Sequence, residues 1–226
     1  MRKTIGSRIL VPVLAVLALA GFANASSIGG LASPLNESEA SMAVVMGYSQ
    51  RDVKDGIKDE ARSKRFLLKG AYGIGHGTDI YVTLGLSDIN YKDANFSGSL
   101  GQSFGAGVRF SPTEFADGTK LVFDLDGDYV SSTDGSNRVT SQTYRGAGYI
   151  VGKFGSSGKF GYFFPYAGLS ISTASYNNPH YSDYKASQNI GLIGGTDFFI
   201  NPNVFFTLEF HIFDESAAYL TAGYRF

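Results

Sequence analysis

The sequence predicts an all-β fold, a closed antiparallel up-and-down transmembrane β-barrel of about ten strands, with eight strands as the alternative. From residue 40 onward, apolar and polar residues alternate with period two in ten successive segments. In most segments one face carries no charge, whereas the opposite face carries glycine, hydroxyl and charged side chains. The segments also suit tilted strands that cross a bilayer, which need about 9–11 residues.

The segment before the barrel reads as an export signal. Arg2, Lys3 and Arg8 precede an apolar run over 9–20, and Ala-Asn-Ala at 23–25 is typical of a cleavage site. The run is shorter than the ~20 residues of a spanning helix. We therefore expect residues 1–25 to be a cleaved signal peptide, 26–38 a flexible periplasmic lead-in and 39–226 the barrel.

Composition narrows the functional classes. Residues 1–25 hold three of the 19 Lys+Arg and none of the 20 Asp+Glu, so 16 basic and 20 acidic residues remain, a net charge of −4. This balance argues against a nucleic-acid partner. The chain has no cysteine, so an exported product contains no disulfide framework. No cofactor and no metal site are predicted.

The expected strands follow one another along the whole chain. They cover 40–51, 63–75, 79–91, 101–111, 120–131, 141–154, 160–174, 187–200, 203–213 and 217–226. Met42, Val44, Met46 and Tyr48 form the apolar face of the first segment, and Val204, Phe206, Leu208, Phe210 and Ile212 form that of the ninth. The faces of 141–154 and 160–174 are mixed, because Tyr149 and Val151 share a face with Arg145.

A soluble barrel would bury these apolar faces, and a membrane barrel would turn them outward. The polar faces combine many glycines with charges of both signs, which suits a narrow interior filled by paired side chains. Because glycine weakens strands, the exposed strand faces of a soluble barrel would be expected to contain few glycines. The sequence therefore favours apolar side chains toward lipid and ionised side chains toward the lumen.

The connections alternate in length. Residues 52–62, 92–99, 132–140 and 176–186 are expected to be long polar loops, whereas 75–77, 155–158 and 201–203 are expected to be short turns. Short periplasmic turns and longer outer loops are typical of bacterial membrane barrels. The connection 214–216 is the exception, because it is an expected outer loop and yet very short. If it does not join two strands, the barrel has eight strands.

The last strand carries a family resemblance. Ala218, Leu220, Ala222, Tyr224 and Phe226 share one face, and Tyr166-Ala167-Gly168-Leu169-Ser170 and Asp197-Phe198-Phe199-Ile200-Asn201-Pro202 also resemble strands of small bacterial outer-membrane β-barrel proteins. The resemblance implies a place in the cell outer membrane, contact with outer-membrane lipid and lipopolysaccharide, and assembly by the barrel-assembly machinery. Tyr224 and Phe226 would be the assembly signal.

Charged residues on the lumen faces are the first candidate site. Asp124, Asp126 and Asp128 point the same way from one strand, with Arg109 and Arg145 on the strands before and after it. Three carboxylates on an extended strand spread over about 13 Å, too far for one metal ion. Because buried charges need partners, we expect a lumen ion-pair network.

Two enzymatic alternatives remain open. Asp126 and Asp128 opposite Glu209 and His211 resemble the acid and acid–His pairs with which omptins, ten-stranded outer-membrane proteases, activate water. His180-Tyr181-Ser182 is similar to the His-x-Ser pair of outer-membrane lipid A deacylases.

The aromatic loop residues are candidates for binding an extracellular ligand. Tyr176, His180, Tyr181 and Tyr184 are amphipathic, as is typical of recognition surfaces. The leading hypothesis is a non-enzymatic barrel with a structural or surface-interaction role through its outer loops. A narrow, porin-like channel for small solutes is the second hypothesis, and an outer-membrane hydrolase is the third.

Overall fold

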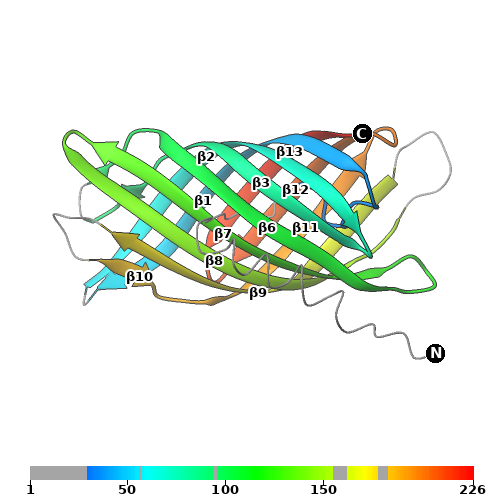
Figure 1. The fold of residues 1–226 in the computed structure, drawn as a ribbon. Coiled ribbons are helices and arrows are strands. Elements are labelled where there is room, and N and C mark those ends of the chain that lie inside the picture. Colours follow the sequence, from blue (N-terminus) through cyan, green and yellow to red (C-terminus); the bar gives the residue numbers. More distant parts are fainter. Residues whose placement is uncertain (1–29, 56, 94–95, 155–161, 178–182) are drawn as a thin grey trace, which may run out of the picture.

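The computed structural model describes residues 30–55, 57–93, 96–154, 162–177 and 183–226, so the expected signal peptide lies outside the described residues. Ten long antiparallel strands form the barrel (Figure 1). They are β1 (Ala40–Asp55), β2 (Ile57–Gly75), β3 (Thr78–Ser87), β6 (Gly101–Glu114), β7 (Lys120–Asp134), β8 (Asn137–Val151), β9 (Tyr162–Asn177), β11 (Ile190–Phe199), β12 (Val204–Ile212) and β13 (Ser216–Arg225). The predicted all-β fold and the count of ten strands are confirmed.

The barrel closes because β1 pairs with both β2 and β13. Val44 on β1 lies opposite Leu68 on one side and opposite Ala222 on the other. The first and last strands therefore leave no open sheet edge. Among the described residues, no helix is long and apolar enough to cross a membrane.

The outer wall of the barrel carries an apolar belt, as predicted. Leu84, Leu125 and Ile171 are 60–64% exposed on three different strands. In contrast, Asp79 and Glu209 are fully buried inside the barrel, and Arg109 is 1% exposed. A continuous exposed apolar band around a charged interior is the pattern of a barrel that sits in lipid.

The strands differ in height, and this difference creates a second structure at one end. β1, β2, β7, β8 and β9 have 15–19 residues, whereas β11, β12 and β13 have 9 or 10. The expected loops at 52–62 and 132–140 are instead mainly continuations of the β1–β2 and β7–β8 hairpins. We call this end the loop end, and the opposite end, with Phe226 and the turns at 76–77 and 200–203, the turn end; the short turn expected at 155–158 lies outside the described residues.

Three short strands close the tall hairpins into a cap above the shorter strands. β10 (Tyr184–Ala186) pairs with both β9 and β1. β4 (Asn90–Tyr91) pairs with β2 and with β5 (Phe96–Ser97), and an isolated bridge joins Ser99 to Thr133 of β7. These pairings connect the hairpins around the loop end.

The cap inverts the pattern of the membrane wall. Its interior is a cluster of buried apolar side chains, namely Val53, Ala61, Ile89, Tyr91, Phe96, Val130, Val139, Ala174 and Tyr176. Asp52, Lys54 and Arg62 point outward and are exposed. An apolar core with a charged exterior is the arrangement of a water-soluble domain, so the cap lies beyond the lipid belt.

The N-terminal segment enters the barrel from the turn end. We expected residues 26–38 to be a flexible periplasmic lead-in, but Leu31, Ala32 and Leu35 are buried inside the lumen. They pack against inward apolar side chains, including Tyr81 and Phe205 around Leu31 and Leu35, and Tyr149 and Val151 around Ala32. This packing explains the mixed faces of β8 and β9. We call residues 30–36 the plug.

Candidate functional site

The lumen between the plug and the cap holds the candidate site, and its lowest layer fixes the plug. Asp79 accepts a hydrogen bond from the backbone N–H of Leu35 at 2.9 Å, and the guanidinium of Arg109 pairs with both of its oxygens at 2.9 and 3.2 Å. Asp197 accepts bonds from the N–H of Ala32 at 2.8 Å and from the hydroxyl of Thr207 at 2.7 Å. Two buried carboxylates thus accept hydrogen bonds from backbone N–H groups of the plug. These bonds replace the hydrogen bonds that water would otherwise donate.

Two further contacts hold the plug from the other side of its backbone. The hydroxyl of Tyr149 donates to the carbonyl of Ala32 at 3.0 Å, and the Thr207 hydroxyl, whose single proton is shared with Asp197, lies 3.1 Å from the carbonyl oxygen of Gly30. Asn36, the last residue of the plug, lies directly over Gly73, where a Cβ would be 1.8 Å from the Asn36 carbonyl oxygen. A glycine at position 73 is therefore required by the close approach of the segment.

The predicted acid stripe lies in the lumen, but its members have different partners from those expected. Arg109 is the cross-strand neighbour of both Asp79 on β3 and Asp124 on β7, and its ion pair is with Asp79. Asp124 instead accepts a hydrogen bond from Tyr81 at 2.7 Å. Asp128 forms its ion pair with Arg65 of β2. Lumen side chains extend across the interior, so strand adjacency alone does not determine which charges meet.

Arg145 and the acid–His pair form the middle of the lumen. The His211 ring lies between Glu209, 2.9 Å from Nε2, and Glu215, 3.0 Å from Nδ1. Arg145 is 2.7 Å from His211 Nδ1 and 3.4 Å from Glu215. Asp126 is the cross-strand neighbour of Arg145, but neither of its oxygens has a hydrogen-bond partner among the described residues.

These four hydrolase candidates are enclosed. Asp126 and Asp128 are 8% and 2% exposed, His211 is 1% exposed and Glu209 is fully buried. Tyr166 also donates a 2.8 Å hydrogen bond to Glu209 from the side away from His211. Each of Glu209 and His211 is thus engaged with protein groups, and no described cleft leads a peptide to them.

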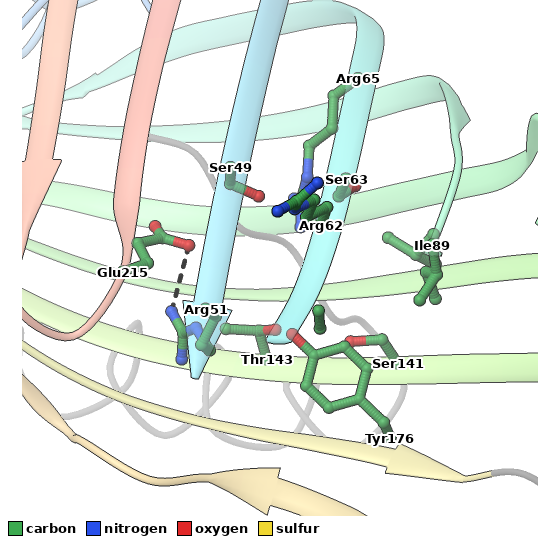
Figure 2. Close-up of a pocket in the computed structure, with 12 residues that line it drawn as sticks. Ser49, Arg51, Arg62, Ser63, Arg65, Ile89, Ser141, Thr143, Tyr176 and Glu215 are labelled. Carbon is green, nitrogen blue, oxygen red and sulfur yellow. Dashed lines mark ion pairs between the residues drawn. The ribbon is translucent and has the colours of Figure 1, made fainter. Parts of the chain in front are cut away.

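A small polar cavity separates this network from the cap (Figure 2). Its volume of about 10 Å³ is on the scale of one water molecule. Arg51 and Glu215 lie at one side, joined by an ion pair of 3.2 Å, and the hydroxyls of Thr143 and Tyr176 face the same space. The apolar cap closes the cavity on the loop side.

The predicted binding loop divides in the structure. Tyr176 is 9% exposed and belongs to the cap core, where its ring is 6.1 Å from that of Tyr91. Tyr184 packs on the same Tyr91 ring at 5.2 Å and is partly exposed. His180 and Tyr181, and with them the deacylase-like pair, lie outside the described residues.

The proposed assembly signal lies at the turn end. Tyr224 and Phe226 are 46% and 64% exposed on the outer wall, with ring centroids 5.0 Å apart. The N–H of Phe226 donates to the carbonyl of Ala40 at 2.8 Å, so the last residue still belongs to the seam between β13 and β1.

Several functional residues were not singled out from the sequence as sites. Asp79 and Asp197 were recognisable only as lumen-facing charges, and nothing in the sequence pairs them with the plug. Asp214 and Glu215 lay in the connection predicted at 214–216, so the alternation could not assign them a side, and Arg51 was the last residue of the predicted strand 40–51. A plug has no periodicity, and only its tertiary contacts reveal it.

Comparison with known proteins yields similar folds at low similarity. No protein-family model matches the sequence, and no curated protein matches it. Among solved structures, Ail of Yersinia pestis has 15% identity over 84% of this chain and 99% of its own, with a TM-score of 0.36. The translocator domain of the autotransporter NalP from Neisseria meningitidis has 11% identity, covering 97% of this chain and 96% of its own, with a TM-score of 0.40. A mutant porin of Rh. blastica has 8% identity over 81% of this chain and 100% of its own, with a TM-score of 0.19. The strand pairing described above, and not these distant similarities, defines the fold.

Proposed function

We propose that this protein is a non-enzymatic outer-membrane barrel whose cap faces the outside of the cell and whose role is structural or surface-interacting. The observation that carries this proposal is that the lumen is filled at both ends. Residues 30–36 occupy the turn end, and the apolar cluster of the cap occupies the loop end. A barrel filled in this way presents its surface to partners and offers no route for solutes.

The enclosed acid–His cluster supports a non-enzymatic role. A general base must reach the proton that it removes, whereas Glu209 and His211 are engaged by Tyr166, Glu215 and Arg145. Glu209 and His211 are therefore held in place by protein groups and connect the two sides of the lumen.

The outer face of the cap is the proposed interaction surface. Its β1–β2 hairpin presents exposed charges of both signs at Asp52, Lys54, Lys58 and Arg62. Such a surface suits the phosphate groups and bridging cations of lipopolysaccharide, as well as a charged extracellular ligand. The apolar belt contacts outer-membrane lipid, and the outer face of β13 would contact the barrel-assembly machinery through Tyr224 and Phe226.

A pair of measurements tests the proposal. Cells that display the protein are compared with cells that display a quadruple variant, Asp52→Asn, Lys54→Gln, Lys58→Gln and Arg62→Gln, for binding of labelled lipopolysaccharide and a panel of extracellular proteins. We expect at least one ligand to lose most of its binding in the variant, while Lys153→Gln at the turn end has no effect. Equal binding to all three would refute a surface role for the cap.

The second measurement is conductance in planar bilayers. The purified protein is expected to give no steady single-channel steps, because plug and cap both obstruct the lumen. Steady steps would instead favour the narrow-channel hypothesis.

A further inference from the structure

The lipid-facing wall carries an apolar groove over β9, β11 and β12, three strands that are neighbours in the sheet (Figure 1). The groove has a volume of about 460 Å³ and is lined by Phe163, Pro165, the backbone of Gly195, Thr196, Phe198, Leu208 and Phe210.

The registers of the three strands explain why the wall is hollow here. Gly194 and Thr196 are consecutive outward positions of β11, and both are small. Thr196 lies opposite Pro165 on β9 and Leu208 on β12, and the next outward residue is Phe198. Gly194 has no side chain and lies opposite Ala167 on β9 and Phe210 on β12. These small residues therefore leave a depression, which Phe198 and Phe210 border.

The interior of the barrel does not require a glycine at position 194. Its inward neighbour Gly195 is required, because a Cβ there would be 2.6 Å from the hydroxyl of Tyr166. At Gly194 the nearest atom to an added Cβ is the Tyr166 carbonyl oxygen at 3.5 Å, an ordinary contact. The missing side chain at 194 thus has no explanation in the packing of the lumen and leaves space only on the outer face.

A row of aromatic rings borders the groove at its turn end and runs across neighbouring strands, because Phe163 is the cross-strand partner of both Phe198 and Phe154. The rings of Phe198 and Phe163 are 6.3 Å apart and nearly parallel at 21°, and those of Phe163 and Phe154 are 5.6 Å apart at 24°. Stacking holds these rings in place. The groove is therefore an apolar depression with a fixed aromatic border, which suits an extended hydrocarbon chain.

We propose that this groove is a binding site for one acyl chain of a glycerophospholipid. The inference rests on the membrane placement made in the proposed function, because the groove lies within the belt that faces hydrocarbon. The occupant therefore comes from the hydrocarbon phase of the membrane. The lining is almost entirely apolar, so it contacts an acyl chain and offers almost no polar surface to a headgroup. Phe198 and Phe163 lie close to the turn-end limits of β11 and β9, so the headgroup of the lipid would lie at the interface on that side.

Native mass spectrometry after detergent extraction from phosphatidylethanolamine–phosphatidylglycerol vesicles tests this site. The wild type is expected to retain one phospholipid, and Thr196→Leu, which fills the centre of the groove, is expected to lose that peak. Gly194→Leu is the second variant, and its ordinary Cβ contact keeps the barrel foldable, as heat-modified gel mobility will verify. The control is Gly70→Leu on β2, also an outward glycine, where the nearest atom to a Cβ is 4.0 Å away.

Each outcome bears on the proposal. Retention by the wild type and Gly70→Leu with loss in both groove variants supports the site. Absence of a bound lipid from the wild type, or equal retention by all four proteins, overturns it. A wild-type dimer that dissociates in the groove variants would show that a second copy is the occupant and would also overturn it. None of these outcomes depends on the binding role of the cap, so failure here is distinguishable from failure of the proposed function.

Discussion

Substitution of Gly73 by alanine is expected to displace the plug from the lumen. The added Cβ would be 1.8 Å from the Asn36 carbonyl oxygen, whereas real Cβ contacts are not shorter than 3.0 Å, so the segment must move by at least the 1.2 Å difference. We expect a shift of this size to undock the plug, which breaks both the 2.9 Å bond from Leu35 to Asp79 and the 2.8 Å bond from Ala32 to Asp197.

The energetic consequence follows from these two bonds. A buried group left without its hydrogen bond costs about 1–3 kcal/mol, so losing two disfavours the docked plug by roughly 2–6 kcal/mol. Since about 1.4 kcal/mol is a factor of ten, even the lower figure raises the open population by roughly 30-fold.

The absence of cysteine from the chain provides a clean assay. A single Ala32→Cys reporter, at a position that is fully buried, is treated with a water-soluble thiol reagent. We expect its labelling rate to rise by at least about tenfold when Gly73→Ala is added. The matched control is Gly70→Ala on the same strand, where the nearest atom is 4.0 Å from the new Cβ. Equal rates in the two backgrounds would refute the account of the plug.

Three further predictions concern the network, the cap and a turn. Arg145→Met is expected to lower the free energy of unfolding by about 3–5 kcal/mol in urea titrations of detergent-folded protein, because it leaves buried carboxylates uncompensated. The control Arg62→Met removes an exposed ion pair and should leave the free energy of unfolding nearly unchanged. Phe96→Ala removes an aromatic ring from the cap core and should cost about 3–5 kcal/mol, seen as faster amide exchange in the β1–β2 hairpin while the belt strands stay protected; unchanged exchange there would count against a packed cap. The N–H of Thr119 donates to Asp117 at 2.9 Å and lowers the pKa of that carboxyl below 3.8. The hydrogen bond therefore stabilises the turn above the unfolded-state pKa, and this contribution is lost as the pH falls through the lower pKa of the folded state. NMR titrations should show this pH dependence in the wild type and not in Asp117→Asn.

The membrane wall could be predicted from the sequence because alternation is a local property. Met42 to Tyr48 repeat with period two whatever else the chain does, so the belt and its inward face follow from the pattern. The strand bounds at the loop end could not be predicted in this way. Beyond Ser49 the outward positions of β1 become charged and Val53 becomes a core residue, which reads as a polar loop when the membrane pattern is assumed throughout.

The sequence also could not predict which charged side chains pair with each other in the lumen. Arg109 is the cross-strand neighbour of both Asp79 and Asp124, so the order of strands does not say which acid it pairs with. Asp79 also accepts a hydrogen bond from the plug, a segment without periodicity. The pair of Arg65 with Asp128 joins strands that are not neighbours, so it depends on side-chain reach across the closed barrel. Similar reasoning applies to Glu215, whose buried contact with Arg51 depends on the height difference between β1 and β13.

A nitroxide scan along β1 would test the central claim, that the barrel wall faces lipid while the cap faces water. Single labels at Met42, Met46 and Tyr48 should be accessible to oxygen and protected from a water-soluble relaxation agent, and labels at Asp52 and Lys54 should show the reverse. Strong accessibility to the water-soluble agent at residues 42–48 would place the apolar face in water and contradict the account.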